Sequence, residues 1–199
     1  MEMKSAQHMA RIKHMLDAKG KLPPSLLARK ILCIAYVSAP FDEKERFRFQ
    51  ALHAMTVVRV IARHLKMGYR LRSVERGGNG YRIDLQFEAI YSGKTRLVEV
   101  KSSKQIREVH RIQVALYPHA NADEIVVSNR ETDEILGSEF IEEVQRRAEI
   151  TRQFLTDHLE RAAITYTPHQ DCCYTCANSN CPFLPSVAAH VATNLLQTR

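Results

Sequence analysis

The sequence predicts a mixed α/β fold, in which a central β-sheet is flanked by helices. Three observations favour this class. Apolar residues recur every three or four positions over 42–66 and 138–163, the spacing of helices with one buried face. Residues 81–91 alternate between apolar and polar side chains for most of their length, as in a half-buried strand. A short apolar run at 124–128 adds a further strand, and this order of elements is typical of an α/β core.

The first part of the chain is predicted to be helical. Residues 5–19 have helical periodicity, and a short helix is expected from Ser25 to about Cys33. Ser25 follows two prolines and can cap that helix. The long helix over 42–66 should end at Gly68, because glycine is a common residue just past a helix C-terminus.

The middle of the chain is predicted to form the sheet. Glycine-rich and Ser-Gly-Lys turns separate its first strands, and Pro118 ends the helix that follows them. In the second strand Ile83, Leu85 and Phe87 should share the buried face. From residue 69 onward, strands are expected at 69–75, 81–91, 95–101 and 124–128. Helices are expected at 105–117 and 138–163, and a cysteine-rich loop and a short last helix follow.

Length and charge narrow the classes of function. The 199 residues suit a single domain over 1–199, comprising a helical segment at 1–40, a core at 41–165 and a cysteine segment at 166–199. The net charge of +7 favours an acidic partner such as nucleic acid. The longest purely apolar run, 31–37, is far too short to cross a membrane, and the N-terminus has no apolar signal core, so a cytoplasmic protein without a membrane partner is expected.

An acidic and lysine pattern lies on two strands joined by a tight turn. Glu99 and Lys101 are two positions apart and point to the same side, and a hairpin can bring Asp84 beside them. Two carboxylates and the carbonyl of Val100 form an oxygen site suited to Mg²⁺ or Mn²⁺. Taken alone, these three residues favour an ordinary solvated strand face.

Five cysteines are present, and four of them fall within ten residues: Cys172, Cys173, Cys176 and Cys181. Thiols this crowded do not pair readily into disulfides, so the cluster indicates metal or iron–sulfur ligation. Cys173 and Cys176 have the spacing with which two thiolates hold one centre; Cys181 adds a third ligand and Cys33 a fourth. Cys172 can replace Cys173, and a Cys₄ zinc site is the alternative to an iron–sulfur cluster.

The ordered set of motifs resembles the RecB-like PD-(D/E)-x-K nuclease superfamily, and within it the CRISPR-associated Cas-four exonucleases and their viral relatives. The matching positions in chain order are Cys33, His53, Asp84 in GNGYRID, Glu99 and Lys101 in VEVKSS, Gln113 and Tyr117 in HRIQVALY, and Cys173, Cys176 and Cys181. The resemblance covers about 25–182 and implies a RecB-like restriction-endonuclease-type core.

The resemblance also implies roles for these residues. Asp84, Glu99, Val100 and His53 would hold Mn²⁺ or Mg²⁺, and Lys101 would be catalytic. Gln113 and Tyr117 would contact DNA or support Lys101. The four thiols of Cys33, Cys173, Cys176 and Cys181 would hold an iron–sulfur cluster, with [4Fe–4S] favoured over [2Fe–2S].

The implied activity is cleavage of single-stranded DNA, as an exonuclease from the 5′ end and also as an endonuclease, during CRISPR adaptation with the CRISPR integrase complex as partner. Two alternatives stay open: a stand-alone or viral DNA repair or recombination nuclease, and a non-catalytic zinc or iron–sulfur DNA-binding module. The sequence leaves the oligomeric state open. Cations expected to contact DNA phosphates without reading sequence are Arg70, Arg72, Arg76, Arg82, Lys104, Arg107 and Arg111.

Overall fold

The computed structural model describes residues 22–34, 36, 43–78, 81–117, 122–158, 161, 167, 169–173, 176 and 181. The chain divides into two compact units, one formed by 41–145 and the other by 1–40 together with 146–199. The helices predicted at 5–19 and after the cysteine loop lie outside the described residues. The division into functional segments made above stays a prediction.

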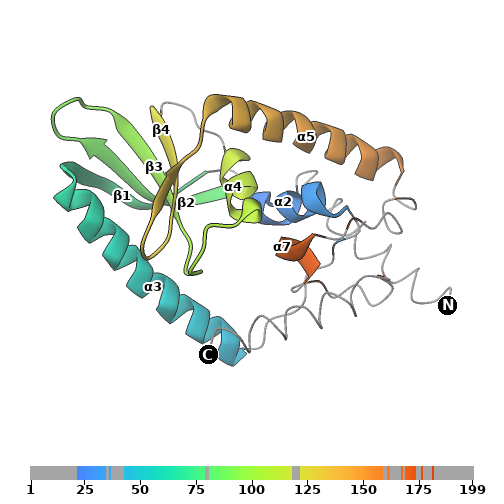
Figure 1. Cartoon of the computed structure of the whole chain (residues 1–199), viewed down its shortest axis with the longest axis horizontal. Helices are drawn as coiled ribbons and strands as arrows, with labels where there is room; N and C mark the ends of the chain where they lie inside the picture. The colour runs from blue at the N-terminus through green and yellow to red at the C-terminus, as the bar shows by residue number, and fades with distance from the viewer. Residues whose placement is uncertain are drawn as a thin grey trace. The chain divides into compact units, whose positions relative to one another are not determined.

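The unit at 41–145 contains a five-stranded mixed sheet (Figure 1). Its strands lie in chain order, and β3 and β4 are parallel while the other neighbours are antiparallel. The strands are β1 (Tyr69–Gly78), β2 (Tyr81–Ala89), β3 (Thr95–Val100), β4 (Glu124–Ser128) and β5 (Asp133–Ile135). A mixed sheet flanked by helices confirms the predicted α/β class.

Helices α3 (Glu43–Lys66) and α4 (Glu108–Ala115) lie on opposite faces of this sheet. Val60 of α3 packs with Val98 and Val126, which are fully buried. The neighbouring strand residues Leu97 and Ile125 point the other way and line a small pocket with Val114 of α4. The two apolar layers therefore bury both faces of β3 and β4, as expected for strands of a parallel pair.

The ends of the long helix follow the prediction more closely than those of the short one. Helix α3 stops before Gly68, whose φ of +85° is a backbone conformation that glycine adopts without a side-chain clash. The expected Ser25 cap is wrong. In α2 (Pro24–Leu32) the cap position is Pro23, and no side chain caps the helix. Because Pro24 has no N–H to satisfy, this first turn needs one capping bond fewer.

Strand β5 was not predicted. It has only three residues, Asp133 to Ile135, and its pattern carries no period long enough to recognise. Pairing with β4 places it at the edge of the sheet. The last described long helix, α5 (Ser138–Asp157), ends earlier than the expected residue 163.

In the other unit, α2 and the short α7 (Gln170–Cys173) are in contact. The Arg29 guanidinium donates to the Asp171 carbonyl at 3.2 Å, and the Cys172 thiol lies 3.5 Å from the Arg29 carbonyl. Arg147 donates to the Ile31 carbonyl at 3.5 Å. These contacts join segments more than a hundred residues apart. Within the described residues, no helix is both long and apolar enough to cross a membrane.

Candidate active site

The β2–β3 ladder ends at the position of Asp84. The last paired residues are Leu85 and Val98. Beyond them, the Val100 N–H donates to the Asp84 carboxylate at 2.7 Å, so a side chain takes the bond that a strand carbonyl would accept. The same carboxylate lies 3.4 Å from Nε2 of His53 on α3. The sheet and α3 thus converge on Asp84.

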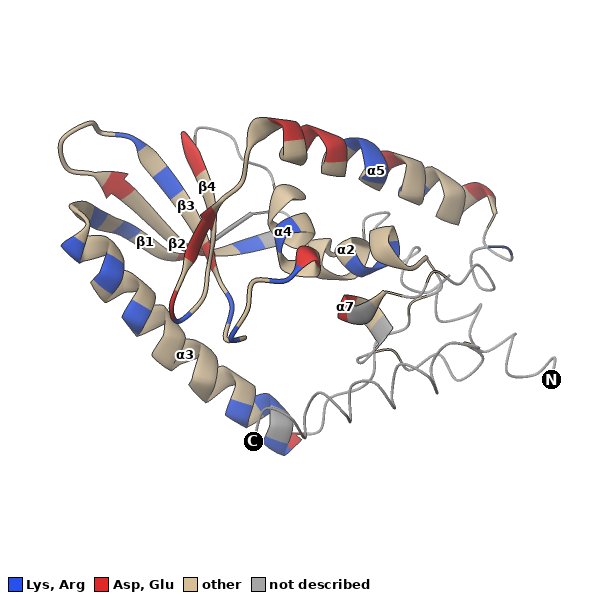
Figure 2. Ribbon diagram, in the orientation of Figure 1, with Lys and Arg blue, Asp and Glu red and all other residues tan. Residues whose placement is uncertain are grey.

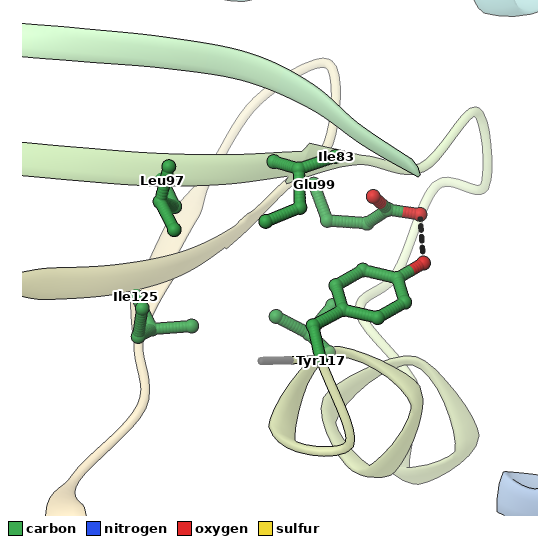
Figure 3. Close-up of a pocket in the computed structure, with 6 residues that line it drawn as sticks. Ile83, Leu97, Glu99, Tyr117 and Ile125 are labelled. Atoms are coloured by element: carbon green, nitrogen blue, oxygen red, sulfur yellow. Dashed lines mark hydrogen bonds between the residues drawn. The ribbon is translucent and has the colours of Figure 1, made fainter. Parts of the chain in front are cut away.

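Glu99 lies on β3, and its hydrogen bonds come from the residue that follows β3, from α4 and from the segment just after α4. Its Oε1 accepts hydrogen bonds from Lys101 Nζ at 2.8 Å, from the Tyr117 hydroxyl at 3.2 Å and from Gln113 Nε2 at 3.3 Å. Figure 3 shows the Tyr117 ring beneath this carboxylate, in a pocket that Leu97 and Ile125 also line. The other oxygen, Glu99 Oε2, is buried and has no hydrogen-bond partner among the described residues.

Lys101 is held from two sides. Its backbone N–H donates to the Ser128 carbonyl at 2.7 Å, which extends the β3–β4 pairing by one residue. Its ammonium also donates to Gln113 Oε1 at 3.0 Å. Gln113 in turn donates to the Tyr117 hydroxyl at 2.6 Å. The one-turn spacing of Gln113 and Tyr117 therefore orients both the lysine and the carboxylate.

Burial and neighbouring charges shift three pKa values here. Burial raises the pKa of Glu99 above its ordinary value; Asp84 adds to the rise and Lys101 opposes it. Burial, reinforced by the charge of Glu99, raises the pKa of Tyr117 well above its usual range, so the hydroxyl stays protonated and can donate. The hydrogen bond to Asp84 raises the pKa of His53, although partial burial opposes this. Shifts of this kind concentrate at functional sites.

The donor set has the chemistry that a hard divalent cation requires. It comprises the carboxylates of Asp84 and Glu99, the imidazole of His53 and the Val100 carbonyl. The orphaned Glu99 Oε2 is a buried acceptor that a cation would satisfy. As arranged, however, no three His, Cys, Asp or Glu side chains of the described residues converge closely enough to hold an ion. Binding would therefore require the Glu99 or His53 side chain to rotate.

The predicted metal-binding and catalytic residues form two groups of contacts: Asp84 contacts His53 and Val100, and Glu99 contacts Lys101, Gln113 and Tyr117. The sheet face predicted for one residue of β2 is wrong. Ile83 was expected on the face of Leu85 and Phe87, yet it lines the pocket with Leu97, Glu99 and Tyr117 (Figure 3). The cause is local, because β2 stops pairing with β3 at Leu85, while it stays paired with β1, and Asp84 bonds to Val100 through its side chain.

The predicted cluster ligands are only partly described. Cys33 and Cys172 are buried and Cys176 and Cys181 are half-buried, and the Cys173 side chain lies outside the described residues. Cys33 follows α2 directly, and its N–H bonds to the Arg29 carbonyl at 2.8 Å. The contacts between α2 and α7 therefore bring the Cys33 end of the unit towards the cysteine segment. The choice between Cys172 and Cys173 is not tested.

Several cations expected to face DNA are engaged within the protein. Arg70 and Arg72 both pair with Glu88 on the exposed face of the hairpin. Arg111 pairs with Glu134 at 2.5 Å. Figure 2 shows instead that Lys and Arg recur along α3, the helix that carries His53. These helix cations were not among the residues predicted to contact DNA, although their repeat is visible in the sequence.

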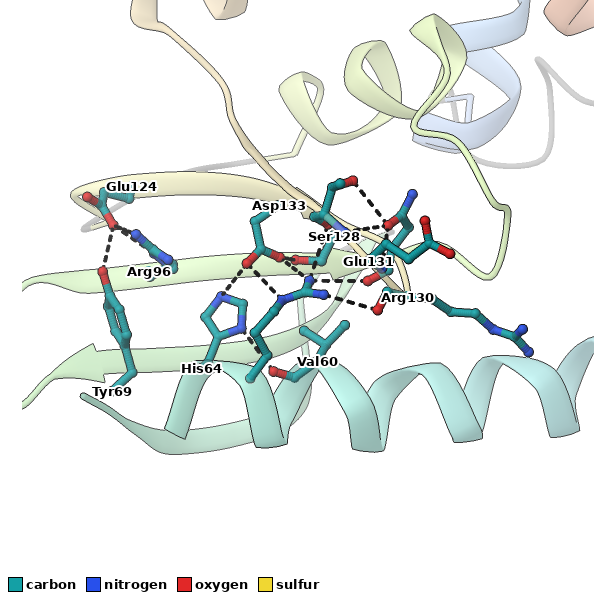
Figure 4. A network of polar contacts seen from close by, with 12 residues as sticks. Val60, His64, Tyr69, Arg96, Glu124, Ser128, Arg130, Glu131 and Asp133 are labelled. Atoms are coloured by element: carbon teal, nitrogen blue, oxygen red, sulfur yellow. Dashed lines mark hydrogen bonds and ion pairs between the residues drawn. The ribbon is translucent and has the colours of Figure 1, made fainter. Parts of the chain in front are cut away.

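A second polar network joins α3 to the β4–β5 turn (Figure 4). The Arg63 guanidinium pairs with Asp133 and donates to the carbonyls of Asn129 and Arg130 at 3.1 and 3.2 Å. His64 is fully buried and stacks on Phe87 at 4.6 Å between ring centres. The Arg63 contacts join α3 to the turn that follows β4, the strand whose Ser128 carbonyl accepts the Lys101 N–H.

Comparison with protein-family models found no match to this chain. Neither curated proteins nor solved structures gave a match.

Proposed function

We propose that this chain is a metal-dependent DNA nuclease, which cleaves single-stranded DNA from the 5′ end and has endonuclease activity at the same site. One observation carries the proposal. The hydrogen bonds linking Tyr117, Gln113 and Lys101 converge on Glu99, whose second oxygen is buried without a partner, beside the Asp84–His53 pair. A polar cluster this heavily buried is costly for stability, which favours a functional reason for it.

The metal would be held by Asp84, Glu99, His53 and the Val100 carbonyl. A bound Mn²⁺ or Mg²⁺ supplies polarisation of the scissile phosphate and a more acidic water. Asp84 is already oriented by the Val100 N–H, and one oxygen of Glu99 is held by three donors. Rotation of the Glu99 or His53 side chain would complete the donor set, and the oriented Asp84 carboxylate reduces the reorganisation needed during the reaction.

Lys101 is the catalytic residue in this proposal. Two of its three N–H groups are engaged by Glu99 and Gln113, and the third can donate to the attacking water or to a phosphate oxygen. Its side chain is 17% exposed, which leaves a route to the substrate. The developing negative charge on the phosphate is then stabilised by an ammonium in a water-poor setting.

The second part of the proposal is an iron–sulfur cluster held by Cys33, Cys173, Cys176 and Cys181. The cysteine spacing and the contacts of α2 with α7 support it. The described thiols do not by themselves form a set of three, so the cluster's role is assigned only as structural closure of this unit. Iron and acid-labile sulfide in anaerobically purified protein, lost in Cys33→Ser, would support it, and stoichiometric zinc would replace it.

The test of the nuclease is cleavage of end-labelled single-stranded DNA with Mn²⁺. Wild type, Lys101→Ala and the control Lys94→Ala are compared, because Lys94 is an exposed lysine in the β2–β3 turn, at the end of β3 away from Lys101. Cleavage by wild type and by Lys94→Ala but not by Lys101→Ala is the expected result. Equal activity in all three would refute the assigned mechanism. No cleavage by folded, metal-loaded wild type would favour a non-catalytic DNA-binding module.

The biological setting that we propose is trimming of DNA for CRISPR adaptation with the integrase complex. Only the resemblance of the motifs supports this setting. A stand-alone or viral repair nuclease would use the same residues, and gene neighbourhood separates the two.

A further inference from the structure

Helix α3 is apolar on two faces, and only one of them is covered. The inner face carries Val57, Val60 and Ile61, which pack on the sheet. On the opposite face, apolar residues recur every three or four positions for five turns. We call this face the outer α3 strip, and its members are Phe47, Ala51, Met55, Val58, Ala62 and Leu65.

The large side chains of the strip are strongly exposed. Phe47 is 73% exposed, Val58 66%, Met55 56% and Leu65 50%. Apolar residues scattered singly on a surface need no explanation, but a continuous row along one helix marks an interaction site. Neither the sheet packing nor the site around Glu99 uses this row, because His53 and Val60 face the other way.

Cations line one edge of the strip. Arg48, Arg59 and Lys66 are exposed and recur after about three and then two helical turns, so they lie in one row beside Met55 and Val58. Within the described residues, the structure gives no ion pair to any of the three, in contrast to Arg63 on the inner side. We call this row the basic edge.

We propose that the outer α3 strip binds an amphipathic α-helix of another protein, with acidic residues along the edge of its apolar face. The spacing of the strip is that of helix-to-helix packing, in which apolar knobs every three or four residues enter holes on the partner. Ala51 and Ala62 alternate with the large residues and leave such holes. The basic edge selects for Glu or Asp at the flanking positions of the partner.

A second copy of this chain is a poorer occupant. Helix α3 has no acidic residue after Glu45, so a symmetric pair offers nothing complementary to the basic edge. In an antiparallel pair the two basic edges would face each other and repel. A membrane surface is also disfavoured, because the alternation of alanine with large side chains fits a helix better than a bilayer, and the row of Arg48, Arg59 and Lys66 follows one edge of the strip.

The experiment measures binding of the whole chain to two synthetic helical peptides of about four heptads, with Leu at the core positions and either Glu or Lys at the flanking ones. Fluorescence anisotropy should show the Glu peptide bound at least about tenfold more tightly than the Lys peptide. The variant Arg48→Glu/Arg59→Glu should reverse this preference, and Val58→Asp should abolish both interactions. Ile150→Asp, at an exposed apolar residue on α5, is the matched control and should bind as wild type.

Three results would overturn the proposal. Equal binding of both peptides by wild type and the charge-reversed variant would show non-specific hydrophobic adhesion. Self-association in sedimentation that Val58→Asp removes would identify a second copy as the occupant. Flotation with phosphatidylserine vesicles, lost in Val58→Asp, would identify a membrane surface. All substituted positions are exposed, so thermal unfolding of the variants should match wild type.

Discussion

Arg63 is the cation whose removal should cost the most stability. It makes five hydrogen bonds, two to the Asp133 carboxylate and one each to the carbonyls of Asn129, Arg130 and Thr132. These bonds join α3 to the β4–β5 turn, which orders the edge of the sheet (Figure 4). Arg63→Met keeps the aliphatic part of the side chain and removes the guanidinium group with all its hydrogen bonds.

The magnitude follows from burial. Breaking a buried ion pair by removing one partner costs about 3–5 kcal/mol, because the remaining charge is left uncompensated. The side chains of Arg63 and Asp133 are 24% and 16% exposed, so the lower end applies, about 3 kcal/mol. For a chain of this length, that loss lowers Tm by roughly 6–12 °C.

The assay is urea unfolding followed by circular dichroism, with Arg59→Met as the matched control. Arg59 lies one turn earlier on the same helix and is exposed, so its replacement should change stability by less than about 0.5 kcal/mol. Arg63→Lys keeps the positive charge without the planar guanidinium group, and its loss of stability should lie between those of the other two variants. A loss below about 1 kcal/mol for Arg63→Met, or equal losses for both arginines, would refute the reasoning.

Four further outcomes are expected. Arg63 and Ser128 hold the pKa of Asp133 below its ordinary value, although burial opposes this. The stability that the Asp133 carboxylate contributes is therefore present above that ordinary pKa and is lost as the pH falls. Asp133→Asn should flatten the acid unfolding curve below about pH 4. Because the pKa of Glu99 is raised, its negative charge destabilises the folded state at neutral pH. Glu99→Gln should therefore raise Tm at pH 7 in EDTA, and this gain should fade as the pH falls to the ordinary pKa of a glutamate. Tyr117→Phe should cost about 1–3 kcal/mol in urea unfolding, since the hydrogen bonds of the hydroxyl with Glu99 and Gln113 are both lost, and should lower DNA cleavage. Phe87→Ala should cost about 3–5 kcal/mol in the same assay, because the ring is fully buried against His64.

Tests of the site and of the scaffold separate cleanly. Lys101→Ala addresses the chemistry, whereas Arg63→Met addresses the turn that follows β4. Lys101 bonds to Ser128 at the end of β4, and Ser128 bonds to Asp133, the partner of Arg63. Arg63→Met should therefore also reduce cleavage, in proportion to the fraction of molecules in which this region is unfolded. Loss of cleavage without loss of stability in Arg63→Met would place this arginine in the site instead.

The sequence by itself determined the long helix, four of the five strands and the shared side of Glu99 and Lys101. Each depends on a local period or on a stop such as Gly68, and these act through near neighbours in the chain. The one-turn spacing of Gln113 and Tyr117 was likewise enough to predict that they act together.

Only the tertiary structure decided which polar groups meet. The reversal of Ile83 arises because Asp84 bonds across the hairpin, and β5 exists because β4 offers it an edge. Helix α3 is apolar on both faces, so its pattern does not say which face the sheet covers. Such choices depend on residues distant in sequence, whose contacts form only when the chain closes.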